Sequence, residues 1–218
     1  TGETFFLNPS KFENQLKLAQ ELLDDKNYLE ALSVVEPILK KDSLNITART
    51  RKIDAYQGLE KYDQALNEVN RLINQLGLSP DFLIWRASVF ENLKNPEKAE
   101  MDLNKAIALD STYLFGYKSR GDFYRIQNKY NESISDFTKI LELDPDNLYA
   151  MYRRANSYSI LEINDKALVD YFRCEQLDTD QSFAKEYYLF TGIALTYKDL
   201  NQYEKALEYF SKEFEISP

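Results

Sequence analysis

From Phe12 onward, apolar residues recur at the spacing expected of amphipathic helices. The stretch 114–147 shows this most clearly, because small and aromatic residues lie four and three positions apart in each half, which keeps them on one helical face. A polar turn at 128–130 separates the halves, and the stretch ends in a run containing Pro145, which cannot continue a helix. The pattern predicts a helical hairpin with Tyr117, Gly121 and Tyr124 on its first helix and Ser133, Phe137 and Ile140 on its second.

The hairpin pattern repeats every 34 residues. After an N-terminal tail, residues 1–11, the period holds without a gap for five units, and a sixth follows a five-residue insertion at 182–186. The sequence therefore predicts one repeat region, 12–218, whose units span 12–45, 46–79, 80–113, 114–147, 148–181 and 187–218.

Two columns of each unit hold mostly small residues, and two hold large apolar ones. The eighth column reads Ala19, Ile53, Ala87, Gly121, Ala155, Ala194, and the twentieth reads Ala31, Ala65, Ala99, Ser133, Ala167, Ala206. The eleventh and twenty-fourth columns are almost entirely large, as in Tyr124 and Phe137. Small residues predict close helix crossings, and large ones predict the filling between them.

This pattern resembles the tetratricopeptide repeat, whose order of aromatic, small, Tyr, Ala or Ser, Phe and Pro residues is nearly complete in residues 114–147. The resemblance covers residues 12–218. It implies an all-α, right-handed solenoid of six antiparallel helical hairpins. It also implies a concave groove, lined by the first helix of each unit, in which most family members hold an extended peptide or a partner's helix.

Some positions depart from the family pattern. Arg49 and Ile53 stand in the second unit where a large apolar residue and a small residue are expected, so less regular packing is predicted there. Pro37 lies inside a predicted helix, where a local kink is expected rather than a break. Ser79 before Pro80 and Asn95 before Pro96 predict helix caps.

The two ends raise questions of docking. Phe5–Leu7 predict either a tail packed on the first helix or a tail that docks onto another molecule, and Ser10 predicts a cap for that helix. At the other end, part of the apolar stripe that includes Phe210 and Phe214 has no predicted cover, so we expect self-association through the C-terminal repeat. The chain starts at Thr1 rather than Met, which leaves room for an upstream signal or lipid-attachment segment. The sequence therefore assigns no cellular compartment.

Composition excludes several classes of function. A net charge of −9 argues against a nucleic-acid partner, and the longest uncharged apolar stretch, 187–197, is shorter than the roughly 18 residues of a membrane span. Histidine is absent, which removes the usual general base and every His-containing zinc site. The single cysteine, Cys174, occupies a packing column and predicts a buried thiol. We therefore expect no catalytic residue, metal or cofactor.

Candidate binding residues follow from the repeat register. Positions 2, 5, 6, 9, 12 and 13 of each unit are expected to face the groove, and in units three to six they interleave cations with aromatic rings, which are enriched at binding hot spots. A solvated helix face is the alternative interpretation. The predicted peptide-binding residues are Trp85, Lys118, Asp122, Arg125, Tyr149, Tyr152, Arg153, Asn156 and Tyr188.

One subfamily of these repeats binds the C-terminal carboxylate of chaperones through Lys and Asn in one unit, Asn in the next, and Lys and Arg in the third. Lys118 matches the first of these by position, but Asp122 and Arg153 stand where Asn is required, and Tyr188 and Gly192 replace the last basic pair. A chaperone clamp is not predicted.

The sequence thus predicts a non-enzymatic protein-interaction scaffold that holds an unidentified protein or peptide, for which the cations of the groove favour an acidic segment. Two alternatives stay open. One is a structural module that oligomerises through its terminal repeats, and the other is the non-catalytic repeat domain of a larger enzyme or secretion assembly.

Overall fold

A computed structural model describes residues 12–217, and these residues form thirteen helices and no strand. The chain divides into two compact units, residues 1–109 and 110–218. The predictions made for the tail, including Phe5–Leu7 and the Ser10 cap, lie outside the described residues.

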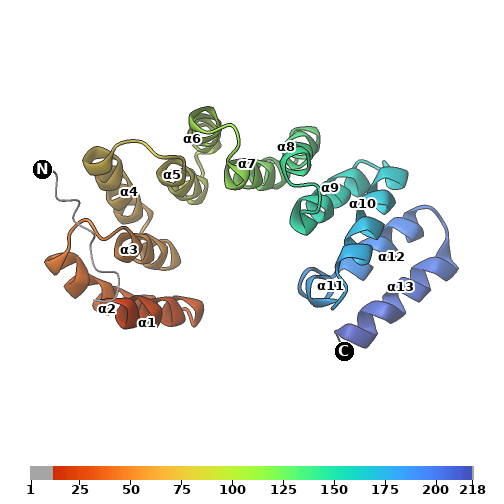
Figure 1. The fold of residues 1–218 in the computed structure, drawn as a ribbon, viewed down its shortest axis with the longest axis horizontal. Helices are drawn as coiled ribbons and strands as arrows, with labels where there is room; N and C mark the ends of the chain where they lie inside the picture. The colour runs from red at the N-terminus through yellow and green to blue at the C-terminus, as the bar shows by residue number, and fades with distance from the viewer. Residues whose placement is uncertain (1–11, 218) are drawn as a thin grey trace, which may run out of the picture. The chain divides into compact units, whose positions relative to one another are not determined.

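Unit 1 is a stack of three helical hairpins, in which each helix contacts the next along the chain (Figure 1). Its helices are α1 (Glu13–Asp24), α2 (Tyr28–Lys41), α3 (Ile46–Gly58), α4 (Tyr62–Leu76), α5 (Pro80–Asn92) and α6 (Pro96–Leu109).

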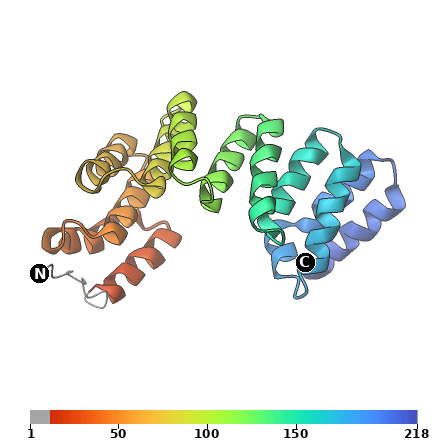
Figure 2. The same ribbon diagram turned by 45° about the horizontal axis from the view of Figure 1, so that its top comes forward.

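Unit 2 adds three hairpins and one short extra helix. Its helices are α7 (Leu114–Ile126), α8 (Tyr130–Leu143), α9 (Leu148–Ile160), α10 (Asn164–Leu177), α11 (Ser182–Tyr187), α12 (Leu189–Asp199) and α13 (Tyr203–Ile216). The last hairpin packs on the one before it through contacts of α12 with α10 and α9, and both views show the two hairpins side by side (Figures 1 and 2). The six predicted hairpins are confirmed.

Every hairpin turns through one residue in the left-handed conformation, with φ between 57° and 61°. The N–H of the following residue donates to the carbonyl five residues earlier at 2.7–2.9 Å, which is the Schellman pattern of helix ends. The same turn in all six repeats fixes how the two helices of each hairpin meet. The left-handed residues are Lys26, Glu60, Lys94, Asn128, Glu162 and Asn201.

Side-chain caps start several of the first helices of the hairpins. Asn45, Ser79 and Asn147 each accept a hydrogen bond from the backbone N–H three residues on, at 2.9–3.2 Å. Asn95 accepts in the same way at the start of α6, at 3.2 Å. The caps predicted at Ser79 and Asn95 are confirmed.

The two small columns mark the closest helix contacts within each repeat. All twelve of their residues are buried, and Ala99 and Ala167 have no exposed surface. At Gly121 an added Cβ would lie 3.0 Å from the ring of Phe137, so the small residue makes room for the large one. The residues of the small columns are therefore buried where the helices meet, as the repeat register predicts.

Three hairpins also carry a buried arginine–aspartate pair that joins their two helices. The Nε and Nη2 atoms of each arginine donate to the two carboxylate oxygens at 2.6–2.9 Å. All three aspartates are buried, so each carboxylate relies on its arginine for compensation. The pairs are Arg86–Asp102, Arg120–Asp136 and Arg154–Asp170.

The departures in unit 1 are absorbed by polar contacts. Arg49 is 3% exposed, and its Nη1 donates to Glu68 at 3.0 Å while its Nε donates to the carbonyl of Ser43 at 2.8 Å. Lys52 adds an ion pair to Glu68 at 3.3 Å. Helix α2 continues through Pro37 without a break, as predicted, and the local kink expected there stays a prediction.

Candidate functional site

Unit 2 brings together charged and aromatic side chains from α7 and α9, two helices that contact each other. Asp122 of α7 accepts a hydrogen bond from the Tyr149 hydroxyl of α9 at 2.6 Å. The same carboxylate lies 3.6 Å from Lys118 Nζ and 3.6 Å from Arg153 Nε. We call Lys118, Asp122, Tyr149 and Arg153 the α7–α9 cluster. Register alone predicted all four residues as neighbours on one face.

Both cations of the α7–α9 cluster lie over the ring of Tyr149. Lys118 Nζ is 4.2 Å from the ring centroid, and the guanidinium carbon of Arg153 is 4.9 Å from it. These distances are within cation–π range. The cluster is therefore a cationic layer on an aromatic base, with one internal carboxylate.

The cluster shifts the pKa values of its members. Burial and then the hydrogen bond to Asp122 raise the pKa of Tyr149 to about 12. Burial alone would lower the pKa of Arg153, but the neighbouring Tyr149, Asp122 and Tyr152 outweigh burial and raise it. At neutral pH the tyrosine is thus neutral and the arginine is charged.

Two buried polar atoms of the cluster face each other. Asp122 Oδ1 and Arg153 Nε have no hydrogen-bond partner within residues 12–217, but they form an ion pair at 3.6 Å. Arg125, which lies three residues after Asp122 on α7, also has a buried Nε without a hydrogen-bond partner in the described residues. Because these atoms are buried, a ligand would contact the exposed parts of Lys118 and Arg153, whose side chains are 39% and 23% exposed.

The insertion predicted at 182–186 forms helix α11, which covers the aromatic side of the cluster. Tyr187 lies 5.8 Å from Tyr149 and 5.7 Å from Tyr152 between ring centroids, and Phe183 stacks on Tyr187 at 4.4 Å. The Tyr152 hydroxyl donates to the Tyr187 carbonyl at 2.6 Å. At the other end, the Asp178 carboxylate accepts from the backbone N–H groups of Phe183 and Ala184.

The remaining predicted residues have separate surroundings. Asn156 uses its Oδ1 to accept from the buried Tyr171 hydroxyl, so its amide oxygen is occupied inside unit 2. Tyr188 is 59% exposed and adopts the left-handed conformation between α11 and α12, with φ 54°. Trp85 belongs to α5 of unit 1.

Trp85 lines a pocket of about 210 Å³ between α3 and α5. Thr50, Asp54 and Gln57 recur at helical spacing along α3, and Ser88 lies three residues after Trp85 on α5. The repeat register predicts these α3 residues on the groove face, but it does not predict that they form a pocket.

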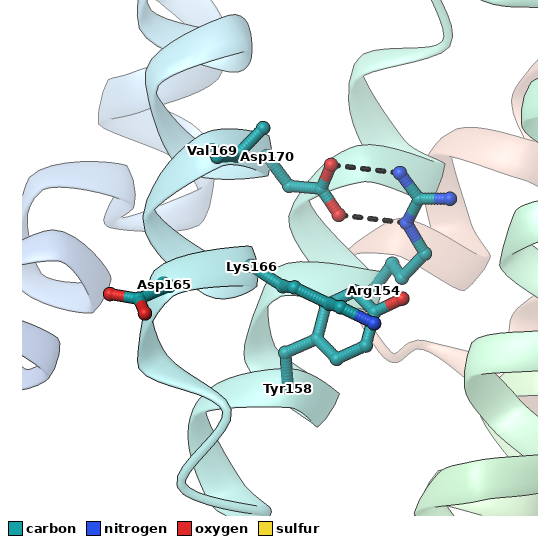
Figure 3. A pocket seen from close by; sticks show the side chains of 6 residues that line it. All are labelled: Arg154, Tyr158, Asp165, Lys166, Val169 and Asp170. Atoms are coloured by element: carbon teal, nitrogen blue, oxygen red, sulfur yellow. Dashed lines mark hydrogen bonds and ion pairs between the residues drawn. The ribbon is translucent and has the colours of Figure 1, made fainter.

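A second pocket, of about 300 Å³, lies beside the Arg154–Asp170 pair in unit 2 (Figure 3). The Lys166 ammonium lies over the Tyr158 ring at 5.5 Å, and Val169 is 68% exposed at the pocket edge. The two hydrogen bonds of the salt bridge occupy both carboxylate oxygens, as the dashed lines show. Besides that pair, Tyr158, Asp165 and Lys166 are the polar residues of the lining.

Other chemistry has little support in the described residues. Cys174 is buried, as predicted, and burial raises the pKa of its thiol to about 12. Within residues 12–217, no group of three or more Cys, Asp or Glu side chains could hold a metal ion. The helices of the same region are also too short and too polar to cross a membrane.

The repeated hairpins, with small residues at their crossings and side chains gathered on their first helices, define the class of helical-repeat scaffolds for protein interaction. Two models of the tetratricopeptide repeat match the chain, one at residues 50–113 and the other at residues 118–147 and 184–218. The chain belongs to the tetratricopeptide repeat family.

Individual proteins are similar to this chain over part or most of its length. A DnaJ homolog subfamily C member 7 homolog from Schizosaccharomyces pombe is 27% identical over 150 residues, which are 60% of this chain and 31% of that protein. The chain thus spans less than a third of that relative.

Solved structures share the fold. A tetratricopeptide repeat protein from Parabacteroides merdae superposes with a TM-score of 0.68 at 19% identity, over 97% of this chain and 81% of the other. YrrB, described as a TPR protein with an unusual peptide-binding site, superposes with a TM-score of 0.53 at 21% identity, over 81% of this chain and 91% of the other.

Proposed function

We propose that this chain is a non-enzymatic scaffold that holds an acidic peptide segment of a partner protein on the α7–α9 cluster. The observation that carries the proposal is the pair of partly exposed cations, Lys118 and Arg153, held over the ring of Tyr149. A partner carboxylate would contact both cations. YrrB, which shares the fold, is described as binding peptide.

The absence of catalytic groups supports a scaffold rather than an enzyme. The chain has no histidine, and its one thiol is buried with a raised pKa, which opposes thiolate formation. Three buried aspartates, Asp102, Asp136 and Asp170, pair with arginines of the neighbouring helix. These features support structural roles for the charged residues inside the hairpins.

Helix α11 is proposed to be part of the same binding surface. Its Phe183 and Tyr187 extend the aromatic layer beyond Tyr149 and Tyr152, so a partner would contact several aromatic rings next to the cations. Aromatic residues and arginine contribute large buried area at interfaces for a modest loss of side-chain entropy.

Charge reversal in the cluster is the direct test. Lys118→Glu with Arg153→Glu should weaken peptide binding at least about tenfold, because a desolvated charged hydrogen bond contributes roughly 1.5–3 kcal/mol and an exposed one less. The measurement is selection of peptides from a random display library on the parent protein, followed by titration of the selected peptides against both proteins.

The matched control is Lys166→Glu with Lys205→Glu, two exposed lysines outside the cluster. It changes net charge by the same amount and should leave binding unchanged. Circular dichroism checks that each variant folds. Selection of peptides without acidic residues, or equal weakening by the control, would show that the cluster is not the binding surface.

A second candidate function, self-association, is favoured by one observation on α13. Tyr203, Leu207 and Phe214 are 56%, 66% and 72% exposed, and with Phe210 they form one stripe at helical spacing. Single exposed apolar residues are common, but a contiguous stripe marks an interaction site.

Light scattering at rising concentration tests the second candidate. The parent should gain mass with concentration, and Leu207→Ser with Phe214→Ser should stay monomeric. A parent that is monomeric throughout the range would remove this candidate and leave the peptide-binding proposal untouched.

A further inference from the structure

The pocket beside Trp85 in unit 1 has a chemistry different from that of the α7–α9 cluster. It combines one large aromatic ring, one carboxylate and several hydrogen-bond donors in about 210 Å³. The ring of Trp85 is half-buried and packs on Phe82 at 5.4 Å between centroids, so its position is fixed. A fixed indole that lines an open pocket is a platform on which a ligand can stack.

The hydrogen bonds around Gln57 leave donors available in the pocket. Gln57 Oε1 accepts from Asn92 Nδ2 at 2.7 Å and from Ser88 Oγ at 3.2 Å. Because the oxygen is used twice, the amide nitrogen keeps its two N–H donors for another group. Arg51 also lines the pocket, but its Nε atom is buried and cannot donate to a docking peptide. The Gln57 donors suit a carbonyl oxygen of an extended peptide.

The carboxylate of Asp54 favours a cationic group of the ligand rather than a carbonyl oxygen. Asp54 keeps an exposed surface, yet desolvation by its neighbours raises the pKa of its carboxyl above the ordinary value, and the charge of Arg51 only partly opposes that rise. An added cation would therefore stabilise the charged form of Asp54. Asp81 lies four residues before Trp85 on α5, so a second acidic side chain follows the same helical face.

We propose that the Trp85 pocket binds an extended peptide segment through an arginine or lysine side chain, whose cation stacks on Trp85 beside the carboxylate of Asp54. A backbone carbonyl of the peptide accepts a hydrogen bond from the Gln57 amide nitrogen. Tryptophan is the best aromatic partner for a cation. This site selects a basic peptide, whereas the α7–α9 cluster is proposed to select an acidic one, so the two proposals stand independently.

The protein carries its own reporter for this site, because Trp85 is the one tryptophan in the chain. The probe is a blocked five-residue peptide with a central arginine between alanines, and the matched probes have leucine or glutamate at the centre. The arginine peptide should change Trp85 fluorescence saturably. Asp54→Asn should weaken its binding roughly 3- to 10-fold, in line with one partly exposed charged contact.

Two controls make the result specific. Asp63→Asn removes the same charge from an exposed position on α4, outside the pocket, and should leave binding unchanged. The variant with Lys118→Glu and Arg153→Glu should bind the arginine peptide as the parent does, which separates this site from the proposed function.

Three results would overturn the proposal. The first is a glutamate or leucine peptide that binds as tightly as the arginine peptide, and the second is an unchanged affinity in Asp54→Asn. The third is the lack of any saturable fluorescence change up to about 10 mM peptide, a concentration at which even a weak specific contact would be detected.

Discussion

Arg120→Met should lower the free energy of unfolding by about 3 kcal/mol at pH 7, at the lower end of the 3–5 kcal/mol typical for breaking a buried ion pair. The substitution keeps most of the side-chain length but leaves the buried carboxylate of Asp136 without its two charged hydrogen bonds. Arg120 itself is one-fifth exposed, which argues for the lower end. Urea denaturation followed by circular dichroism gives the value.

The same variant should respond to pH in a defined direction. Burial raises the pKa of Asp136, and Arg120 opposes that rise, so removing Arg120 raises the pKa further. An aspartate whose pKa is higher in the folded state destabilises the fold above that pKa. The deficit relative to the parent should therefore be full at pH 7 and shrink as pH falls through the folded pKa toward the unfolded value of about 4.

The matched control replaces both partners. Arg120→Met with Asp136→Leu removes the carboxylate as well, and an apolar pair in place of a buried ion pair is often neutral or stabilising. This double variant should recover most of the stability and lose the pH dependence. If Arg120→Met is as stable as the parent at pH 7, the repeated arginine–aspartate pairs do not hold the hairpins together.

The fold could be predicted because small and large residues recur together at a fixed spacing. One small residue says little, but Ala99 and Ala167 stand in a column whose members are all buried. The sequence does contain a signal for the ion pairs, because Arg86, Arg120 and Arg154 recur every 34 residues. The recurrence does not by itself predict pairing, because charged residues in helices are usually solvated. Only the structure shows that each arginine has a buried aspartate partner.

The residues of the candidate site could be predicted better than the arrangement of their side chains. Register places Asn156 on the first helix with Tyr149 and Arg153, but it does not specify the rotamer that turns the Asn156 amide to Tyr171. Helix α11 escaped prediction because an insertion of five residues is too short to show helical periodicity. Its position depends on tertiary contacts, the Asp178 carboxylate at one end and the Tyr152 hydroxyl at the other.

Ala167→Leu should lower the free energy of unfolding by about 1–3 kcal/mol, because it inserts a branched side chain where two helices meet closely. Ala167 has no exposed surface, and it packs in one cluster with Met151, Ala155 and Tyr171 between α9 and α10. Ala99→Leu should have a similar effect in unit 1, since Ala99 fills the same column. Denaturant unfolding measures both variants.

Val169→Leu is the control on the same helix. Val169 is 68% exposed two residues from Ala167, so enlarging it should change stability by less than about 0.5 kcal/mol. The contrast separates overpacking from any general effect of leucine in α10. Equal stability of Ala167→Leu, Ala99→Leu and the parent would mean that the small column does not mark the helix crossings, and the repeat register inferred from it would be wrong.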